Sequence, residues 1–549
     1  MRHLRLPPLR SVLLWCTTAL CAAAAVTSAA GCARGPSFVP PGQRKVIDRS
    51  VVDYPGGTVL EEVVRNLTGP CDCEVDSHGN LIVAESGTAG YEPHIFGIRP
   101  SGQMFNIYPL PRSIRVPFDV AKFGFVIYGP VGGIAVGENN KVFVSHLDAN
   151  GLGTVTAFGY DGSHSTVCGN LPCQGDNGIS DVALSSTGRV WVGVGSATNS
   201  GVVGLDDWEW VKHYPNFADR TYVDLKLNGY HFKSKNPDAG IFGGPEIAVT
   251  APFQPFNVSS QTRIRRSEFP TAAVYSADAA GGGTRVEAHG IRAPRGLAFS
   301  PFGNLYLTDG GMELRGTRPI KDDPDTLLRF APGAWYGFPD YSASLQPVTD
   351  ARFQPPPEMA IKSGYDEISS LIDHNASNNG AGLIPPVPSL LQATFPSLSG
   401  AARFDFVPDT GPLAQYAGNI IVPLSGDHAP FATSGRKLIE PVGFKVVRID
   451  PASRETTDFI RNTKGRPASM LKGGEGLLER PAAVKFAPDG TMYLVDFGRL
   501  SVDKDGREKI RPNSGRIFIL RALPAPSTQP ATTAPTTRPA HGGGATDKP

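Results

Sequence analysis

The sequence predicts an all-β fold, a six-bladed β-propeller with long insertions between its strands. One hairpin pattern recurs six times along the chain, and glycine and proline, with 63 and 50 residues, are abundant enough for many turns. A single blade cannot bury both faces of its sheet alone, so repeated blades stack side by side around a common axis.

The clearest copy of the pattern begins the stretch from Ala288 to Tyr341. Its apolar residues alternate up to a turn at residues 300–304 and alternate again as far as Leu307, which indicates a β-hairpin. It ends in Asp309 and two glycines, where a carboxylate beside bare backbone suggests a site. The other copies share an apolar strand, a polar glycine turn, a second apolar strand and a small or acidic end. They are Cys71–Gly87, Gly132–His146, Ile179–Gly195, Ala401–Leu424 and Pro481–Gly498.

The two widest gaps between copies, residues 196–288 and 341–401, are expected to hold the insertions. Such insertions commonly build the walls of a site at one mouth of a propeller channel. The predicted organisation is a signal peptide, a linker, the propeller and a disordered tail rich in Pro, Thr and Gly. These segments are residues 1–32, 33–45, 46–521 and 522–549.

The N-terminus carries an export signal. Three arginines within the first ten residues precede an uncharged stretch, residues 11–30, that closes on small residues. Residues 29–32 resemble a bacterial lipobox, which predicts a lipid on Cys32; the alternative is an ordinary cleavage site nearby. We expect a periplasmic or cell-envelope protein. Because no later segment has 18 consecutive apolar residues, its membrane contact would be through this lipid.

Net charge and cysteine content limit the binding partners and cofactors that the sequence supports. The 52 basic residues nearly balance the 51 acidic ones, so nothing indicates nucleic-acid binding. Export leaves Cys71, Cys73, Cys168 and Cys173, an even set that predicts disulfides in an oxidising compartment. We favour a Cys168–Cys173 pair, with pairing to Cys71 or Cys73, or zinc binding, as alternatives. The absence of a Cys-x-x-Cys-His motif excludes attached c-type haem.

Several motifs occur in the order found in one known family. They are GVGSATNSGVVGLDDW (193–208), AHGIRAPRGLAF (288–299), the stretch around WYGFP (315–341) and RPAAVKFAPDG (480–490). Over residues 59–520 the chain resembles the glucose/sorbosone dehydrogenase family, six-bladed propellers that oxidise sugars with pyrroloquinoline quinone. The resemblance implies an exported oxidoreductase acting on a sugar or related alcohol or aldehyde, with an external electron acceptor.

Hydride transfer from a sugar requires a base to take the hydroxyl proton. The family uses a histidine just before the third hairpin, and Asn177 occupies that position here. Asn177 cannot take a proton at neutral pH. Asp176 is the neighbouring candidate base, and an ordinary Asp-Asn-Gly turn is the alternative. Another base could be His146, His289 or His428, although a lone histidine is more often structural.

Basic residues are expected to hold the quinone and polarise its carbonyls. By resemblance, Arg292 contacts the cofactor, while Lys472 and Arg480 bind its carboxylates. The alternatives are a surface arginine at 292 and a solvated loop around Lys472. Ala293 and Ala482 replace two polar residues of the family pattern, so part of the expected contact set is missing.

A calcium site is also implied by the resemblance. The family binds calcium in loops after the fourth hairpin, and here Asp322, Asp323 and Asp325 precede the turn that contains Tyr336. Oxygen ligands at this density suit calcium. Asp325 is the closest match, with Asp323 and Tyr336 as further ligands. The alternative is a solvated Asp-rich turn.

Three functions therefore compete. The first is a quinoprotein-like oxidoreductase, the second a non-catalytic propeller that binds carbohydrate or protein, and the third a calcium-dependent, lactonase-like hydrolase. A proton acceptor beside the quinone would favour the first over the second. Mainly basic groups in the channel would favour the first over the third.

Overall fold

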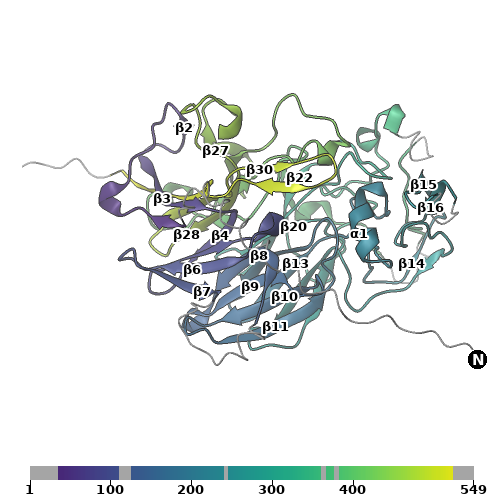
Figure 1. The fold of residues 1–549 in the computed structure, drawn as a ribbon, viewed down its shortest axis with the longest axis horizontal. Coiled ribbons are helices and arrows are strands. Elements are labelled where there is room, and N and C mark those ends of the chain that lie inside the picture. The colour runs from purple at the N-terminus through teal and green to yellow at the C-terminus, as the bar shows by residue number, and fades with distance from the viewer. Residues whose placement is uncertain (1–34, 110–124, 240–244, 360–366, 376–382, 524–549) are drawn as a thin grey trace, which may run out of the picture.

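The computed structural model describes residues 35–109, 125–239, 245–359, 367–375 and 383–523. Within them the chain is almost entirely β-structure, and six sheets form the blades of a propeller, as predicted (Figure 1). The expected signal peptide and Cys32 lie outside the described residues, as does the tail from residue 524 onward. The described part of the linker pairs with the propeller through β1 (Ser37–Phe38).

In every blade the two innermost strands are those of a predicted hairpin. From the axis outward, the first blade consists of β4 (Pro70–Val75), β5 (Leu81–Glu85), β6 (His94–Ile98) and β7 (Met104–Tyr108). The second blade consists of β8 (Tyr128–Val136), β9 (Val142–Leu147), β10 (Gly153–Phe158) and β11 (His164–Leu171). The third blade consists of β12 (Ile179–Leu184), β13 (Arg189–Val194), β18 (Ala273–Asp278) and β19 (Arg285–His289).

The remaining blades follow the same plan. The fourth blade consists of β20 (Pro294–Phe299), β21 (Leu305–Asp309), β22 (Asp325–Arg329) and β23 (Leu391–Phe395). The fifth blade consists of β24 (Asp405–Phe406), β25 (Ile420–Leu424), β26 (Lys445–Ile449), β27 (Thr456–Asn462) and β2 (Val52–Asp53). The sixth blade consists of β28 (Pro481–Phe486), β29 (Met492–Asp496), β32 (Gly515–Ala522), β3 (Thr58–Leu67) and β1.

The ring is closed by pairing the two ends of the propeller. β3, near the start of the described chain, pairs antiparallel with β32 at its end, with Leu60 opposite Leu520. Inner strands of neighbouring blades contact one another, including β28 with β4, so the last blade packs on the first, and Gly296 of β20 lies against Ala402 just before β24. This arrangement gathers residues that are distant in sequence around one axis.

The long insertions lie where the gaps predicted them. The first, between β13 and β18, contains η4 (Leu205–Asp207), α1 (Trp208–His213), β14 (Leu225–Lys226), β15 (Phe232–Lys235), β16 (Ile247–Thr250) and β17 (Arg263–Ile264). The second, between β22 and β23, contains η5 (Ala351–Phe353) and η6 (Pro388–Leu390). α1, β14, β15 and β16 gather at one side of the molecule (Figure 1). The two insertions meet where Leu227 bridges Ile372.

Short elements complete the described chain. They are the 3₁₀ turns η1 (Pro41–Gln43), η2 (Thr88–Gly90), η3 (Glu138–Asn140), η7 (Ala414–Tyr416), η8 (Phe431–Thr433) and η9 (Ala468–Met470), and the hairpin of β30 (Leu500–Val502) and β31 (Glu508–Ile510). Among the described residues no helix combines the length and apolar character needed to cross a membrane.

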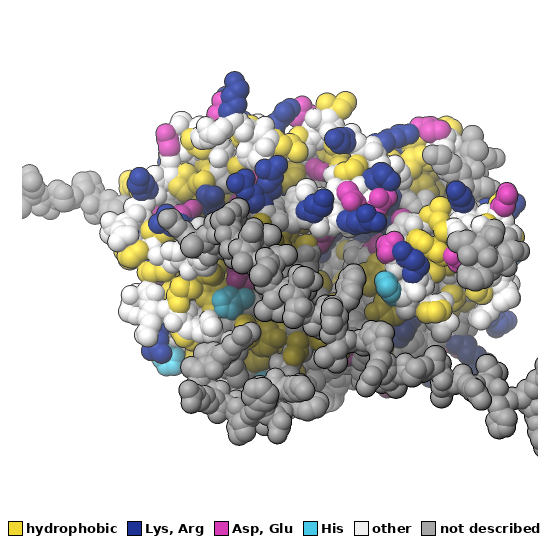
Figure 2. Space-filling model, in the orientation of Figure 1, with side chains coloured by type: hydrophobic (Ala, Val, Ile, Leu, Met, Phe, Trp, Pro, Cys, Tyr) yellow, Lys and Arg dark blue, Asp and Glu magenta, His cyan; other side chains and the backbone are white. Residues whose placement is uncertain are grey.

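The core forms between blades because each strand alternates its side chains between two buried faces. Val155 of the second blade packs in one cluster with Val182, Val192 and Tyr275 of the third, and all four are buried. On the described part of the face in Figure 2, basic side chains are interspersed with acidic and apolar ones, in keeping with a net charge near zero.

The four described cysteines are buried free thiols, so the favoured Cys168–Cys173 disulfide is not formed in the structure. Burial raises the pKa of each thiol, to about 12 for Cys71 and to about 11 for Cys168. The thiols therefore act as small apolar groups in the interblade packing rather than as reactive thiolates.

Candidate functional site

A cavity of about 300 Å³ opens on the propeller axis. Its wall is formed by the segments that lead into the inner strands, by the ends of several second strands, and by Leu500 and Glu508 of the β30–β31 hairpin. The described residues of the two long insertions do not line it. The expectation that these insertions wall the channel mouth therefore does not hold for this cavity.

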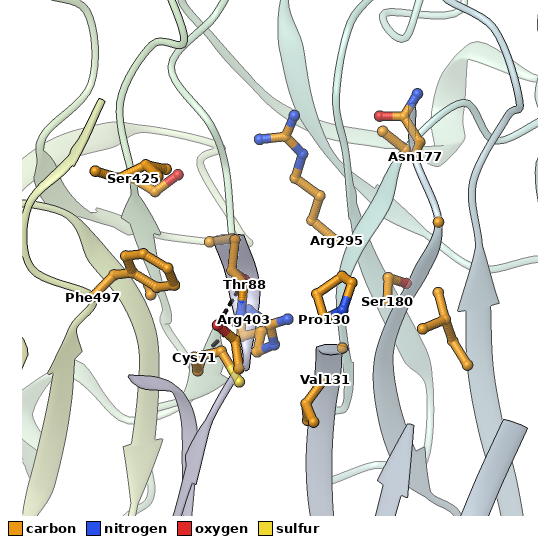
Figure 3. Close-up of a pocket in the computed structure, with 18 of the residues that line it drawn as sticks. Cys71, Thr88, Pro130, Val131, Asn177, Ser180, Arg295, Arg403, Ser425 and Phe497 are labelled. Atoms are coloured by element: carbon orange, nitrogen blue, oxygen red, sulfur yellow. Dashed lines mark hydrogen bonds between the residues drawn. The ribbon is translucent and has the colours of Figure 1, made fainter. Parts of the chain in front are cut away.

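Three arginines from different blades line the cavity. Arg295 comes from β20, Arg403 from the segment before β24, and Arg480 from the segment before β28. Figure 3 shows the Arg295 side chain reaching into the space between Ser425 on one side and Asn177 on the other. The guanidinium of Arg295 has no ion pair or hydrogen bond with a described residue. It is thus free to bind an anion.

Arg403 and Arg480 are held in place by backbone carbonyls. Nη1 of Arg403 donates to the carbonyl of Cys71 at 3.3 Å, while its buried Nε has no hydrogen-bond partner among the described residues (Figure 3). Arg480 donates to the carbonyls of Ser425, Gly426 and Asp427 at 2.7–3.0 Å. Burial lowers the pKa of Arg480, although Asp427 and other acids oppose this shift.

Arg292 lies outside this cavity. It is 2% exposed, and its guanidinium donates to the carbonyls of Asn199, Gly310 and Gly311 and to the side chain of Asn199. Arg292 therefore ties the start of the first insertion to the end of the fourth hairpin. Arg295, three residues further on, lines the cavity instead.

A bulge explains why Arg295 faces the axis. The register of β20 on β21 shifts between Pro294 and Gly296, which leaves Arg295 as the extra residue. The same shift follows Pro70 in β4 and Pro481 in β28, and the extra residues there, Cys71 and Ala482, also line the cavity. A proline at the start of an inner strand is therefore a sequence signal that the next residue faces the axis.

The candidate base Asp176 and its neighbour Asn177 both line the cavity, but each has a partner. Asp176 pairs with Arg315, whose side chain is 3% exposed, so its carboxylate is already engaged in an ion pair. Nδ2 of Asn177 donates to Oγ of Ser196 at 3.1 Å. The pair offers polar contacts to a ligand rather than a general base.

His428 is the one of the three candidate histidines that lines the cavity. Burial, together with the positive charges of Arg480 and Arg295, lowers the pKa of His428 to about 3, so its imidazole is neutral at ordinary pH. His146 is buried, with its ring nitrogens beside Oγ1 of Thr156 and the carbonyl of Leu147. His289 lies in a separate small cavity against the ring of Tyr222.

Lys472, proposed to bind the quinone carboxylates, is exposed on the loop after η9 and does not line the cavity. Ala293 and Ala482, the two departures from the family pattern, do line it. Small apolar side chains at these positions enlarge the cavity and provide no hydrogen bond. Arg480 is thus the one proposed cofactor-binding residue that the structure brings to the axial cavity.

The proposed calcium ligands are occupied by backbone groups. Asp323, which is fully buried, accepts from the amides of Met312 and Ala343 at 2.7 and 3.0 Å, and burial raises its pKa to about 8. Asp325 accepts from the amides of Gly311 and Gly400. The hydroxyl of Tyr336 bonds to the backbone of Ala331 and Arg329, on another side of this region. This geometry supports structural roles, and calcium binding here stays a prediction.

Asp309, which suggested a site at the end of the fourth hairpin, also has a structural role. Its Oδ1 accepts from the amide of Ala293 at 2.6 Å, and Asp496 in the sixth blade accepts in the same way from Arg480. In both blades, an aspartate at the end of the second strand thus fixes, through a hydrogen bond to a backbone amide, the segment that leads into the inner strand. Because Arg295 and Arg480 lie in or near those segments, these acids position the cavity arginines.

A second cavity of about 210 Å³ lies further along the inner strands. It is lined by four carboxylates, Asp72, Glu74, Asp181 and Asp405, and by Arg403 and Lys485. Arg403 lines both cavities and so lies between them. Glu74 pairs with Lys485 at 2.8 Å, while the three aspartates accept from backbone amides.

No protein-family model matches the sequence, and a comparison with curated proteins gives no match. Solved structures similar to the chain include the pyrroloquinoline quinone domain of a pyranose dehydrogenase from Coprinopsis cinerea, with 14% identity, a TM-score of 0.47, and coverage of 86% of this chain and 98% of that one. An aldose sugar dehydrogenase from Streptomyces coelicolor has 15% identity, a TM-score of 0.39 and coverage of 86% and 100%.

A gluconolactonase from Xanthomonas campestris is similar at 10% identity and a TM-score of 0.36, with 89% of this chain and 98% of that one covered. Sugar dehydrogenases and a lactonase thus stand side by side among the similar structures. Likenesses of this strength assign no function to this chain.

Proposed function

We propose that this protein is an exported, quinoprotein-like oxidoreductase that oxidises a sugar or a related alcohol or aldehyde with pyrroloquinoline quinone. The observation that supports it best is the meeting of three arginines at one axial cavity, with Arg295 unpaired among the described residues. Arginine is well suited to bind carboxylates because its planar fork can donate two parallel hydrogen bonds.

The cavity suits this cofactor in charge and size. The quinone carries three carboxylates, and the charged lining of the cavity is mainly basic: Arg295, Arg403 and Arg480 against Asp176 and Glu508. Asp176 is paired with Arg315, which also pairs with Asp206 and Glu313, and Nε of Arg403 lies 3.7 Å from Oδ1 of Asp181. A volume of about 300 Å³ is at the lower end of the range for small-molecule sites. The residues present therefore fit the group, with Arg295, Arg403 and Arg480 as its holders.

The basic lining favours an oxidoreductase over a calcium-dependent lactonase at this cavity. A lactonase needs an exposed set of oxygen ligands to hold a metal against the lactone carbonyl. The second cavity is richer in acids, but its aspartates are bound by backbone amides and Glu74 is paired with Lys485. Those carboxylates serve the packing of the blades.

His428 is the proton acceptor in this proposal. When bound, the quinone supplies an acceptor for the hydride that leaves the sugar carbon, and the hydroxyl proton must go to a base. The pKa of His428 is held at about 3 first by burial and second by repulsion from the positive charges of Arg480 and Arg295. Once both arginines pair with a bound anion this repulsion falls, so the pKa of His428 rises and a ring nitrogen becomes a better acceptor.

The second candidate, a non-catalytic binding propeller, is favoured by Asn177. At the position where the related family has its base, Asn177 carries an amide that bonds to Ser196. Such a protein would bind an anionic ligand through the same arginines without turnover. Activity, rather than binding, separates the two functions.

The activity test uses the exported domain reconstituted with pyrroloquinoline quinone and calcium, and measures reduction of an artificial dye in the presence of aldoses and polyols. We expect turnover by the wild-type protein and a loss of 10²-fold or more on His428→Asn, which is the usual contribution of a general base. His213→Asn, at the exposed end of α1, should keep the wild-type rate. Quinone binding without turnover would select the non-catalytic function.

Export and lipidation form a separate part of the proposal, because residues 1–34 lie outside the described structure. The signal-like composition and the lipobox-like residues 29–32 support a mature chain that begins at a lipidated Cys32. Mass spectrometry of the mature protein would show a diacylglyceryl mass on Cys32. An unmodified N-terminus at another residue would contradict lipid anchoring and leave the enzymatic proposal unaffected.

A further inference from the structure

We propose that Asp176, Asp206 and Asp207 hold a calcium ion beside the axial cavity, at a place distinct from the Asp-rich loop that the sequence indicated. Asp176 lies on the cavity wall before β12, and Asp206 and Asp207 lie in η4 at the start of the first insertion. The proposal concerns cation binding alone, so it does not depend on the oxidoreductase function.

The geometry of the three carboxylates suits calcium. One oxygen from each lies within 4.8 Å of one from each of the others. Calcium binds oxygen at about 2.3–2.6 Å, so two of its ligands can be up to about 5 Å apart, whereas magnesium at about 2.1 Å allows only about 4.2 Å. This spacing is compatible with one cation bound by all three carboxylates, and the longer bonds of calcium tolerate wider spacings than those of magnesium.

Two of the carboxylates have buried oxygens without a partner. Asp207 is fully buried, and while its Oδ2 accepts from the amide of Gly204 at 2.9 Å, its Oδ1 has no partner among the described residues. Oδ1 of Asp206 is likewise buried and without a partner. An unpaired buried carboxylate oxygen is energetically unfavourable, so a cation bound by this cluster would compensate a charge that the protein groups leave without a partner.

The negative charges of this carboxylate cluster are also not fully balanced by nearby basic side chains. Arg315 donates to Asp176, Asp206 and Glu313 through its three guanidinium nitrogens, and Arg292 lies 3.7 Å from Glu313. With Asp207, four carboxylates face two guanidinium groups, which leaves two negative charges. Arg295 also acts on Glu313 from the cavity side, and even then one negative charge remains in excess.

Two glycines allow the backbone to approach Asp206 closely. A Cβ at Gly204 would lie 2.7 Å from Oδ1 of Asp206, and a Cβ at Gly316, where φ is +76°, would lie 2.5 Å from its Oδ2. Glycine at these two positions therefore keeps Cβ atoms away from both oxygens of Asp206, whose Oδ2 is paired with Arg315. The alternative to a cation is a proton shared between the carboxyls, since burial and the charges of Asp206 and Asp176 raise the pKa of Asp207 well above its usual value.

The test is a calcium titration of the whole exported protein after treatment with a chelator, in the absence of any quinone. Calorimetry should show one calcium bound per wild-type chain, and saturation should raise Tm by about 3 °C at a hundredfold excess over Kd. Asp207→Asn should abolish both signals. Its metal-free Tm should equal or exceed that of the wild type, because the amide removes a buried charge and can donate to Asp206.

The matched control is Asp322→Asn, an exposed carboxylate of the Asp-rich loop, which should keep the full calcium response. Absence of calcium uptake by the wild-type protein at millimolar concentration would overturn the proposal. An unchanged calcium response in Asp207→Asn would also overturn it, and loss of the response in Asp322→Asn would return the site to the loop. Because quinone is absent, none of these outcomes tests the oxidoreductase proposal.

Discussion

At the scale of single residues, the buried aspartates of this chain act mainly as acceptors for backbone amides. Asp323 is the clearest case, since both of its oxygens are occupied by the amides of Met312 and Ala343. The sequence showed an Asp-rich loop and so suggested calcium. It could not show which amides those carboxylates meet, because the partners lie 11 and 20 residues away along a folded loop.

Replacing Asp323 with alanine separates the two interpretations. The change leaves two buried amides without an acceptor, so we expect the free energy of unfolding to fall by about 2–4 kcal/mol. The loss relative to the wild-type protein should be the same with calcium and with a chelator, as measured by urea denaturation. A loss seen only with calcium present would show that Asp323 is a metal ligand.

The raised pKa of Asp323 also predicts a pH dependence. Its folded pKa of about 8 exceeds the unfolded value near 3.9, so the folded state binds more protons between these values and loses stability as pH rises through them. The contribution is at most about 1.4 kcal/mol per pH unit. His428 and His289 oppose it at lower pH, since a lowered histidine pKa makes stability increase with pH up to about 6.5.

Measurements of unfolding between pH 6.5 and 8 therefore separate the buried carboxyls from the histidines. Burial also raises the pKa of Glu74, Asp181 and Asp309 to about 7, so the contribution of Asp323 is obtained by comparison with a variant. The wild-type protein should become less stable with rising pH in this window, and Asp323→Asn should show a flatter profile. Asp322→Asn, with an exposed carboxylate, should follow the wild type. Parallel profiles for Asp323→Asn and the wild-type protein would refute the assignment.

At the scale of elements, an aspartate in the inner strand joins neighbouring blades at three of the six contacts around the ring. Asp72 of the first blade accepts from the amide of Ile134 in the second, and Asp181 and Asp405 make the same contact from the third blade to the fourth and from the fifth to the sixth. These contacts fix the spacing of neighbouring inner strands around the axis.

Glycines in β8 permit the closest approach between two inner strands. A Cβ at Gly132 would lie 2.1 Å from the carbonyl oxygen of Ser180 in β12. We expect Gly132→Ala to lower the free energy of unfolding by about 1–3 kcal/mol, because the blades must separate to admit the methyl group. Gly473→Ala, where nothing lies within 4 Å, should have little effect. Denaturation with no difference between the two variants would contradict this packing.

Sequence periodicity was sufficient for these elements but not for the residues of the site. All six hairpins lie where alternation placed them, because period-two alternation directly reflects the two faces of a strand. The same alternation does not predict which of Arg292 and Arg295 faces the axis, because a bulge between Pro294 and Gly296 interrupts it. Arg480 was found by resemblance, whereas Arg295 and Arg403 required the structure.

At the scale of the whole molecule, closure of the ring brings the site together. Arg295, Arg403 and Arg480 belong to three different blades and meet because β3 pairs with β32 and the sixth blade packs on the first. Contacts between residues this far apart in sequence are not visible in local patterns. The fold was therefore predictable from repeats, while the charge of the cavity had to be read from the closed ring.

The measurement that tests this account most directly is a calorimetric titration with pyrroloquinoline quinone. The wild-type protein should bind one quinone, and Arg295→Ala should weaken binding roughly 10- to 150-fold, since a hydrogen bond to a charged group contributes about 1.5–3 kcal/mol. Arg329→Ala, which removes an exposed arginine at the end of β22, should bind like the wild type. Failure of the wild-type protein to bind, or equal affinity in Arg295→Ala, would contradict the account.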